Sequence, residues 1–342
     1  MIRVYVQPSG ESGALAIAES IAAAEALGGN AAANDGAGVS ELVPVDLPDE
    51  RAVASLAERL ALARRCLRWR SESLDILSTL RAEGGAGASA AVRRLGSPSS
   101  GNRDAGVLEA GRAYKAGGGR IDLGDPDRRF WLARGADRAD RLFEEVATVD
   151  RRSATARRMP ALPFQRPVTL PPRLARAAAN LARVRPGDRV VDPFVGTGAL
   201  LAEAGLLGAR IYGVDRDAEM VRGALRNLAH LRVTAEQLVV GDAGDVEFSP
   251  GDGPFDAVLT DPPYGRASST GGEGSAALVE RVLPRWAVRV RPGGRVVVIV
   301  PSQMPDLGPE WRSVVRIPVR VHRSLTREFR VYERAGVTAR SE

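Results

Sequence analysis

The stretch that decides the fold is "RVVDPFVGTGALLAEAGLLGARIYGVD", residues 189–215. It opens with a short apolar run that ends at Asp192, passes through a glycine-containing turn into an Ala- and Leu-rich segment, and closes with a second apolar run that ends at Asp215. Short apolar runs bounded by turn residues are typical of buried strands, and the segment between these two has the length of a helix. The stretch therefore predicts a strand at 189–194, a helix at 198–208 and a strand at 210–215.

The same alternation continues on both sides of this stretch. The apolar patterns predict further helices at 172–184, 218–231 and 277–290, and further strands at 237–243, 256–263 and 295–302. Alternation of apolar strands with helices indicates a mostly parallel sheet that is covered on both faces. Ligands of such sheets bind beyond the carboxyl ends of the strands, so the residues that follow each strand form the candidate site.

Four successive predicted strands end in an aspartate, namely Asp192, Asp215, Asp242 and Asp261. Each has an alternative structural interpretation when taken alone. Asp215, or more readily Asp217, could be the N-cap of the following helix, and Asp242 could begin a turn. Because all four strand ends fall on one edge of the sheet, together they predict a site for a nucleoside ligand.

The turn after the first strand predicts what that ligand is. Gly196 and Gly198 would let a ligand approach the backbone, and the following helix offers free N–H groups. Asp215 lies 19 residues beyond Gly196, where an acid can accept hydrogen bonds from a ribose. NAD is disfavoured because Leu201 stands where its fingerprint needs a third glycine. S-adenosylmethionine fits better, since Asp192 could face its cationic part.

The fourth strand ends in "AVLTDPPYGR", residues 257–266. By itself the segment Asp261-Pro262-Pro263-Tyr264 could equally be a rigid turn or a site. Its position after the fourth acidic strand end favours the site.

The composition excludes several classes of protein. The chain has 342 residues, enough for two domains. Cys66, His230 and His322 are its only cysteine and histidines, which excludes an internal disulfide framework and a Cys/His zinc site, and we expect no metal. No apolar run is long enough to span a bilayer, and the first ten residues do not resemble a secretion leader. We therefore expect a cytoplasmic protein, which we take to be a monomer.

The charge is mildly basic and uneven. The net charge is +6, and residues 311–334 contain seven arginines against Glu328 and Glu333. Of the 48 basic residues all but Lys115 are arginine, which coding bias explains most simply. Arginine would also suit RNA, because its planar fork binds phosphate and stacks on bases.

The N-terminal part has a different pattern. We predict a strand at 1–10, helices at 13–29 and 50–69 with Cys66 in the core, loops or short helices over 83–119, and strands at 120–126 and 128–135. Residues 147–172 show little periodicity and contain five prolines, as is typical of a linker or docking segment.

Several of these segments carry a resemblance. "VVDPFVGTGALLAEAGLLGARIYGVD" and "LTDPPYG" resemble Rossmann-like S-adenosylmethionine-dependent methyltransferases that act on exocyclic amines. "FQRPVTLPPRLARAAANLARVRPGD" and "RVHRSLTREFRVYE" are similar to the archaeal-type tRNA (guanine-10-N2)-methyltransferase family, as is "RIDLGDPDRRFWLARG" in the N-terminal half. The resemblance implies an α/β methyltransferase domain with a mostly parallel seven-stranded sheet at 173–342. It also implies a linker at 147–172 and an α+β ferredoxin-like plus THUMP module that binds tRNA at 1–146.

The resemblance also implies residue roles. Residues 165–170 would form a lip over the cofactor. The cofactor would be held by Asp192, Phe194, Gly196, Thr197, Gly198, Asp215, Arg216, Asp242, Ala243, Thr169 and Leu170. The target base would be held by Asp261, Pro262, Pro263 and Tyr264, and RNA would be contacted by Arg266, His322, Arg323 and Arg327.

The chemistry of an exocyclic amine explains the tetrapeptide. The lone pair of the guanine amine is spread into the ring, so the amine must be made more tetrahedral before it can attack a methyl group. The Asp261 carboxylate and the Pro262 carbonyl could accept its two N–H groups. The prolines stiffen this segment, and Tyr264 offers a ring on which the base can stack.

Three alternatives remain open from the sequence. The amine could belong to guanine at another tRNA or rRNA position, or to adenine N6 in DNA. The chain could be a non-catalytic RNA-binding protein with a relic methyltransferase fold. A NAD-dependent enzyme is the least favoured, because of Leu201 and the D-P-P-Y segment.

Overall fold

A computed structural model describes residues 1–10, 13–33, 36–72, 74–85, 87–96, 104–157, 161–167, 169–248, 254–263, 275–301, 306–308, 310–322 and 325–335. Contacts divide the chain into two compact units. The first contains Met1–Ser9, Leu27–Glu58 and Ala63–Val149, and the second contains Gly10–Ala26, Arg59–Leu62 and Asp150–Glu342. The second unit thus includes two short segments from the N-terminal half that the sequence pattern placed in the first domain.

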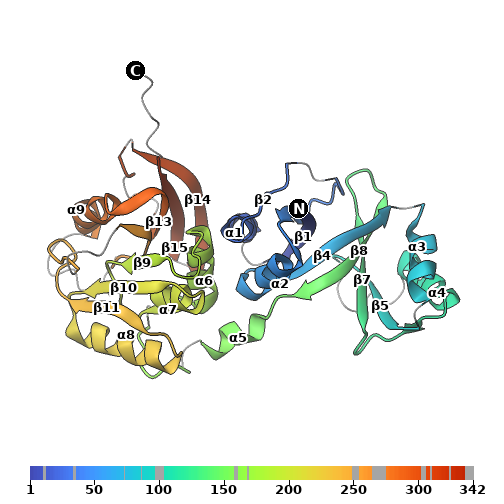
Figure 1. Ribbon diagram of the computed structural model, residues 1–342, viewed down its shortest axis with the longest axis horizontal. Coiled ribbons are helices and arrows are strands. Elements are labelled where there is room, and N and C mark those ends of the chain that lie inside the picture. Colours follow the sequence, from blue (N-terminus) through green and yellow to red (C-terminus); the bar gives the residue numbers. More distant parts are fainter. Residues whose placement is uncertain are drawn as a thin grey trace, which may run out of the picture. The chain divides into compact units, whose positions relative to one another are not determined.

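The described part of the second unit is built on a seven-stranded sheet with strand order β11-β10-β9-β12-β13-β15-β14 (Figure 1). The strands are β9 (Arg189–Asp192), β10 (Arg210–Asp215), β11 (Ala235–Val240), β12 (Phe255–Thr260), β13 (Val290–Val300), β14 (Trp311–His322) and β15 (Leu325–Arg334). The first five in the order are parallel, whereas β15 runs antiparallel to β13 and to β14. The predicted Rossmann-like fold class is therefore confirmed.

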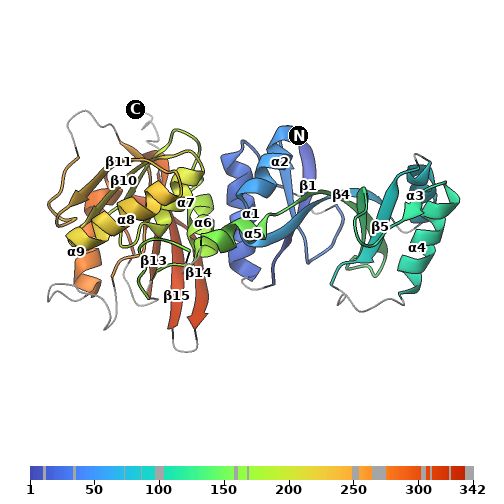
Figure 2. The same ribbon diagram turned by 90° about the horizontal axis from the view of Figure 1, so that it is seen from below.

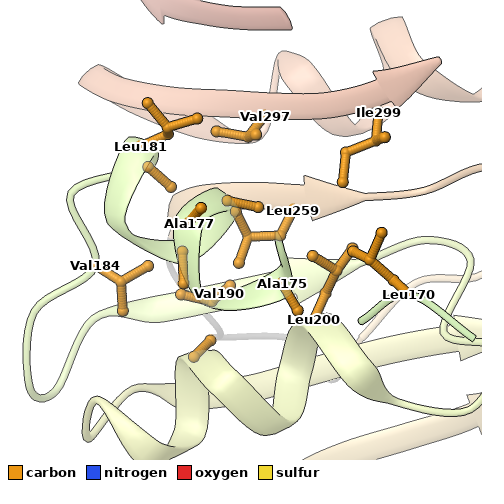
Figure 3. Close-up of a cluster of buried hydrophobic side chains, with 14 of the residues drawn as sticks. Leu170, Ala175, Ala177, Leu181, Val184, Val190, Leu200, Leu259, Val297 and Ile299 are labelled. Carbon is orange, nitrogen blue, oxygen red and sulfur yellow. The ribbon is translucent and has the colours of Figure 1, made fainter. Parts of the chain in front are cut away.

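Helices cover both faces of this sheet because alternate strand residues point to opposite sides. Val190, Leu259 and Val297 belong to one core cluster, while their neighbours Val191 and Val258 belong to another. The first cluster lies under α6 (Pro172–Leu181), α7 (Ala199–Leu206) and α8 (Ala218–His230), and the second lies under α9 (Ser275–Ala287). Figure 3 shows α6 packing its small alanines and a leucine toward the strands. All four predicted helices of this half are confirmed.

The turn between β9 and α7 depends on one glycine. Gly198 is the N-cap residue of α7 and has a left-handed backbone with φ of 83°. A side chain there would also place its Cβ 3.1 Å from the Cβ of Ala224 on α8. Gly198 therefore lets the chain turn sharply and lets α7 and α8 pack closely.

A segment from the start of the chain completes the helical layer of the second unit. Helix α1 (Gly13–Ala26) places the fully buried carboxylate of Glu19 against the N–H groups of Ala61 and Leu62, at 2.9 and 2.8 Å, and against Asn180 Nδ2 of α6 at 2.8 Å. Arg59 donates to Asn180 Oδ1 at 2.9 Å. A buried polar network of this kind is stable because its members satisfy one another.

The first unit contains an eight-stranded sheet in its described residues, with order β2-β3-β1-β4-β8-β7-β5-β6. Its strands are β1 (Ile2–Pro8), β2 (Asn30–Ala31), β3 (Val43–Leu47), β4 (Ala63–Glu72), β5 (Ser89–Arg94), β6 (Arg120–Ile121), β7 (Arg128–Arg134) and β8 (Asp140–Thr148). Pairing is antiparallel except along β7-β5-β6. Helices α3 (Ile76–Gly84) and α4 (Ala105–Ala116) lie side by side against β5 and β7 (Figures 1 and 2). This is an α+β unit, as expected.

Two expectations for this unit need correction. Of the helix predicted over 50–69, only Glu50–Arg59 is helical and forms α2. The segment from Ala63 onward belongs to β4. Cys66 is buried as expected, but it lies on that strand between β1 and β8. Residues 89–94 form β5 rather than a loop or a short helix. In each case cross-strand pairing with distant segments overrides the local pattern.

The segment that follows β8 is partly helical. Helix α5 (Arg151–Ala156) follows β8, and beyond it Leu162 and Phe164 are buried within the second unit.

Candidate active site at the carboxyl edge of the parallel sheet

A cavity of about 580 Å³ lies in the second unit, at the carboxyl ends of the parallel strands. All four predicted strand-end aspartates line it, although they are far apart in the sequence. Its volume falls within the roughly 300–1,000 Å³ that is common for ligand pockets. The cavity is therefore the candidate active site, and its chemistry depends on how each carboxylate is held.

Asp192 ends β9 and is almost fully buried, with 1% of its surface exposed. Its Oδ1 accepts hydrogen bonds from the N–H of Phe194 and from the hydroxyl of Thr260, both at 2.9 Å. Burial raises the pKa of Asp192 to about 7, and the nearby carboxylates of Asp261 and Asp215 add to the increase. A cation bound in the cavity would favour the ionised form of this carboxyl group.

Asp215 ends β10 and closes the glycine loop. Its Oδ2 accepts from the N–H of Gly196 at 2.8 Å, and its Oδ1 accepts from the N–H of Asp217 at 3.0 Å. Burial raises the pKa of Asp215 as well. The helix N-cap is Asp217, which accepts from the N–H of Glu219, as the sequence favoured. Each carboxylate oxygen of Asp215 has a second lone pair that could receive a hydroxyl group.

Asp242 is held by charged groups instead. Arg281 of α9 donates to Oδ1 and Oδ2 at 3.0 and 3.2 Å, and the N–H of Gly244 donates at 2.7 Å. Arg216 lies 3.6 Å from Oδ2. The bond with Arg281 is the main reason why the pKa of Asp242 is lowered.

Asp261 follows β12 directly and also meets a guanidinium group. Nη1 of Arg327 on β15 donates to its Oδ2 at 2.7 Å, and both side chains are largely buried. Pro262 and Pro263 line the cavity beside it. The sequence assigned Arg327 to RNA, but the structure places it against the carboxylate expected to hold the base.

Part of the cavity wall comes from the segment before α6. The N–H of Phe164 donates to Oδ1 of Asn227 at 2.9 Å, and Nδ2 of Asn227 donates to the Phe164 carbonyl at 3.0 Å. The same Nδ2 also donates to the carbonyl of Thr197 at 3.0 Å. Gly223 makes room for this contact, because a Cβ there would lie 2.1 Å from the Phe164 ring. Asn227 thus ties residues 161–167 to the glycine loop.

The structure brings together most of the residues that the sequence nominated. The predicted residues that line the cavity are Thr169, Leu170, Asp192, Phe194, Gly196, Thr197, Asp215, Arg216, Asp242, Ala243, Asp261, Pro262, Pro263 and Arg327. Gly198 lies behind the loop, where it packs on α8. Tyr264, Arg266 and Arg323 lie outside the described residues, as does the side chain of His322 at the end of β14.

Sequence reasoning missed three groups that hold the predicted ones in place: Thr260, Arg281 and Asn227. Asn227 gave a usable signal, since it is a polar residue on the buried face of an amphipathic helix. Thr260 and Arg281 gave none, because their partners are 68 and 39 residues away.

The residues present fit S-adenosylmethionine. Asp192 is a buried carboxylate that accepts hydrogen bonds from a neutral N–H and a neutral hydroxyl, which suits a sulfonium or ammonium group nearby. Asp215, Asp242 and Ala243 line the same cavity at the ends of the next two strands, where the carboxylates can accept hydrogen bonds from hydroxyl or amino groups of a ligand. The cavity also contains apolar surface from Leu170, Phe194 and Leu278.

Comparison with known proteins places the chain in a family. The RMKL-like methyltransferase domain family matches residues 161–326. A probable tRNA (guanine(10)-N2)-dimethyltransferase of Methanothermococcus thermolithotrophicus is 31% identical over 173 residues, which is 47% of this chain and 98% of that protein. The chain belongs to the tRNA (guanine(10)-N2)-dimethyltransferase family.

Longer members of the tRNA (guanine(10)-N2)-dimethyltransferase family match in part. The Methanothermobacter thermautotrophicus protein is 39% identical over 196 residues, 56% of this chain and 57% of that protein. The Pyrococcus abyssi protein is 36% identical over 228 residues, 63% and 64% of the two chains. The matched region thus spans rather more than half the length of these relatives.

A solved structure supports the fold over the whole chain. The crystal structure of TrmN from Thermus thermophilus aligns with 97% of this chain and 99% of that one, with a TM-score of 0.51 and 21% sequence identity.

Two negative observations apply to the described residues of this family member. They contain no helix long and apolar enough to cross a membrane. They also contain no group of three or more histidine, cysteine or acidic side chains that could hold a metal ion.

Proposed function

We propose that this chain methylates the exocyclic N2 amine of a guanosine in tRNA, at position 10, as the names of its relatives say of them. One observation carries the proposal. The Asp261-Pro262-Pro263 segment lies on the same cavity as Asp192 and the glycine loop, so an amine acceptor and a cofactor site share one pocket.

The cofactor supplies an electrophilic methyl group when it is bound. Asp192 and the loop from Phe194 to Gly198 would hold its methionine part, Asp215 and Arg216 its ribose, and Asp242 and Ala243 its adenine. Thr169 and Leu170 would cover it from the lip.

Asp261 and the Pro262 carbonyl would orient the amine. Each would accept a hydrogen bond from one N–H of the amine. This would make the amine more tetrahedral, so that the lone pair of its nitrogen is no longer spread into the ring. Asp261 could then receive the proton, or pass it to water, after the methyl group has been transferred. Most of the rate enhancement would come from positioning and from electrostatics. The guanosine has to leave its base pair to reach the cavity, and Tyr264 would stack on it there.

We further propose that the first unit binds the tRNA. The proposed division is a ferredoxin-like plus THUMP module at 1–146, a linker at 147–172 and the methyltransferase domain at 173–342. The module would contact the tRNA by its shape and phosphates, and Arg266, His322 and Arg323 would contact RNA near the catalytic cavity. A monomer acting in the cytoplasm is the simplest arrangement for this function.

The decisive experiment is methyl transfer from labelled S-adenosylmethionine to a tRNA transcript, followed by nucleoside analysis. We expect N2-methylguanosine, and no product from a transcript with adenosine at position 10. N6-methyladenine in DNA would instead support the nearest alternative. Failure of the pure chain to bind S-adenosylmethionine in calorimetry would support a non-catalytic RNA-binding protein.

One substitution tests the role of Asp261. We expect Asp261→Ala to lower the transfer rate by about 10²- to 10⁴-fold, the usual contribution of a positioned proton acceptor. The same variant should still bind S-adenosylmethionine. Asp256→Ala is the matched control, because Asp256 lies at the other end of β12, the strand that Asp261 follows, and the variant should retain transfer.

A further inference from the structure

Arg327 reaches the catalytic edge because of the direction of its strand. Strand β15 runs antiparallel to β13, and Glu328 pairs with Val300, the last residue of β13. Arg327 precedes Glu328 and therefore lies at the edge where the parallel strands end. Asp261 lies at this edge too, since it follows the last residue of β12. Their contact spans 66 residues of sequence.

Arg327 occupies a position on β15 that would ordinarily be apolar. Alternate residues share a face of a strand, and Arg327 is followed on its face by Phe329 and Val331, both in the core. The residue that pairs with Arg327 on the neighbouring strand β14 is Val319, which is also buried. Arg327 itself is only 8% exposed. A guanidinium group in such a place is costly unless it is paired, so its bond to Asp261 is part of the fold and not a loose surface contact.

Asp261 is surrounded by other carboxylates, so the bond to Arg327 matters for its charge. Asp192 on β9 and Asp215 on β10 line the same cavity, and the charges of Asp192 and Asp261 repel each other. Among the described residues, the other charged groups that line the cavity are Arg166, Arg216, Asp217 and Asp242. Arg166 is bonded to Glu219, and Arg216 lies against Asp242, so these two cations have acidic partners elsewhere. The cation bonded to Asp261 comes from β15.

We propose that Arg327 is a positioning residue of the methyl transfer: through its bond to Oδ2 it places a positive charge beside the Asp261 carboxylate and fixes the orientation of that carboxylate toward the base amine. This inference rests on the proposed function. A carboxylate has about four acceptor sites, so a bond from Arg327 is compatible with a bond from an amine. The anchor is also firm, because Arg327 lies on β15, which pairs with β13 and β14, whereas Asp261 lies just beyond the end of β12.

The test compares Arg327→Met and Arg327→Lys in single-turnover methyl transfer at saturating S-adenosylmethionine and tRNA. We expect Arg327→Met to lower the rate constant by about 10- to 100-fold, as is usual when a group that orients another is lost. The acid limb of its pH profile should move to higher pH, because the variant removes a positive charge beside Asp261 while the carboxyl group of Asp192 stays in the same cavity. Arg327→Lys retains a charge, so it should recover part of the rate and return the limb toward that of the wild type.

Three further measurements separate this role from a structural or RNA-binding one. Thermal unfolding and S-adenosylmethionine affinity show whether each variant is folded with an intact cofactor site. Arg312→Met removes one charge from the same β14–β15 hairpin, at a largely exposed position, and should leave the rate and the pH profile unchanged. In an Asp261→Asn background, Arg327→Met should cause no additional loss, because the two residues act as one unit.

Several outcomes would overturn the inference. One is an unchanged rate constant and acid limb in a folded Arg327→Met variant. Another is a raised KM for tRNA with an unchanged rate constant, which would make Arg327 an RNA contact. A further loss in the Asp261→Asn background would also show that Arg327 acts elsewhere. If the wild-type chain transfers no methyl group to tRNA, it is the proposed function that fails.

Discussion

The four strand-end aspartates of the cavity are held in two opposite ways. At the two inner strands, β9 and β10, Asp192 and Asp215 are held by backbone N–H groups and a hydroxyl, and burial raises their pKa values. Beyond the two outer strands, β11 and β12, Asp242 and Asp261 are held by the guanidinium groups of Arg281 and Arg327. Neutral donors leave a negative charge largely uncompensated, whereas a guanidinium group compensates it.

This difference assigns different tasks to residues of the same type. An uncompensated buried carboxylate attracts a cation, and it titrates when the cation is absent. A carboxylate with an arginine partner stays ionised, and its contribution is the direction of its lone pairs. The first pair is therefore suited to bind a charged cofactor, and the second to orient neutral groups.

The largest effect on cofactor binding should come from Asp192→Asn. Asparagine keeps an oxygen that can accept from Thr260 and Phe194, so the variant removes mainly the charge. We expect S-adenosylmethionine to bind about 10²-fold more weakly, since a hydrogen bond to a charged group contributes about 1.5–3 kcal/mol. Calorimetry measures this change. An unchanged Kd would mean that Asp192 does not face the cationic part of the ligand.

The pH dependence of binding should be the next largest effect. We expect the ionised form of Asp192, whose pKa is about 7, to bind the cationic part of the ligand, so affinity should be full well above pH 7 and be lost as the pH falls below it. We expect binding at pH 6 to be about tenfold weaker than at pH 8, since one pKa unit corresponds to about 1.4 kcal/mol. Asp192→Asn measured over the same range corrects for titration of the ligand and of other groups. Equal pH dependence in both proteins would remove Asp192 as the cause.

The smallest effect should come from Arg281→Met. This residue compensates Asp242, but both side chains are partly exposed, at 39% and 26%. Exposed ion pairs contribute at most about 1 kcal/mol, so we expect less than a fivefold change in the Kd of S-adenosylmethionine. A loss as large as that of Asp192→Asn would contradict the distinction between the inner and the outer pair of aspartates.

The sequence predicted the parallel half of the second unit well because its signal is local. "RIYGVD" has the bounds of β10, and a strand buried on both faces is recognised by its continuous apolar run. These runs also predicted where the strands end, and therefore that the four aspartates lie at the strand ends. The predicted helix over 50–69 failed because its apolar spacing continues past Arg59. The residues from Ala63 onward are strand only because β1 and β8 pair with them.

The partners of the site residues could not be predicted from the sequence, for a different reason. Arg281 and Arg327 meet their aspartates across 39 and 66 residues, and β15 reaches the edge only because it runs antiparallel. A single sequence shows that residues 311–334 are rich in arginine, which predicted an RNA surface. It does not show which arginine faces inward.

The dependence of the catalytic unit on α1 limits how the chain can be divided. A fragment that begins at residue 150 would lose Glu19, the partner of Asn180, and would uncover the apolar side of α6 that α1 covers. The two units are therefore not exchangeable modules. A chimera that borrows this methyltransferase domain must also carry α1 and residues 59–62, both of which are encoded far upstream of Asp150.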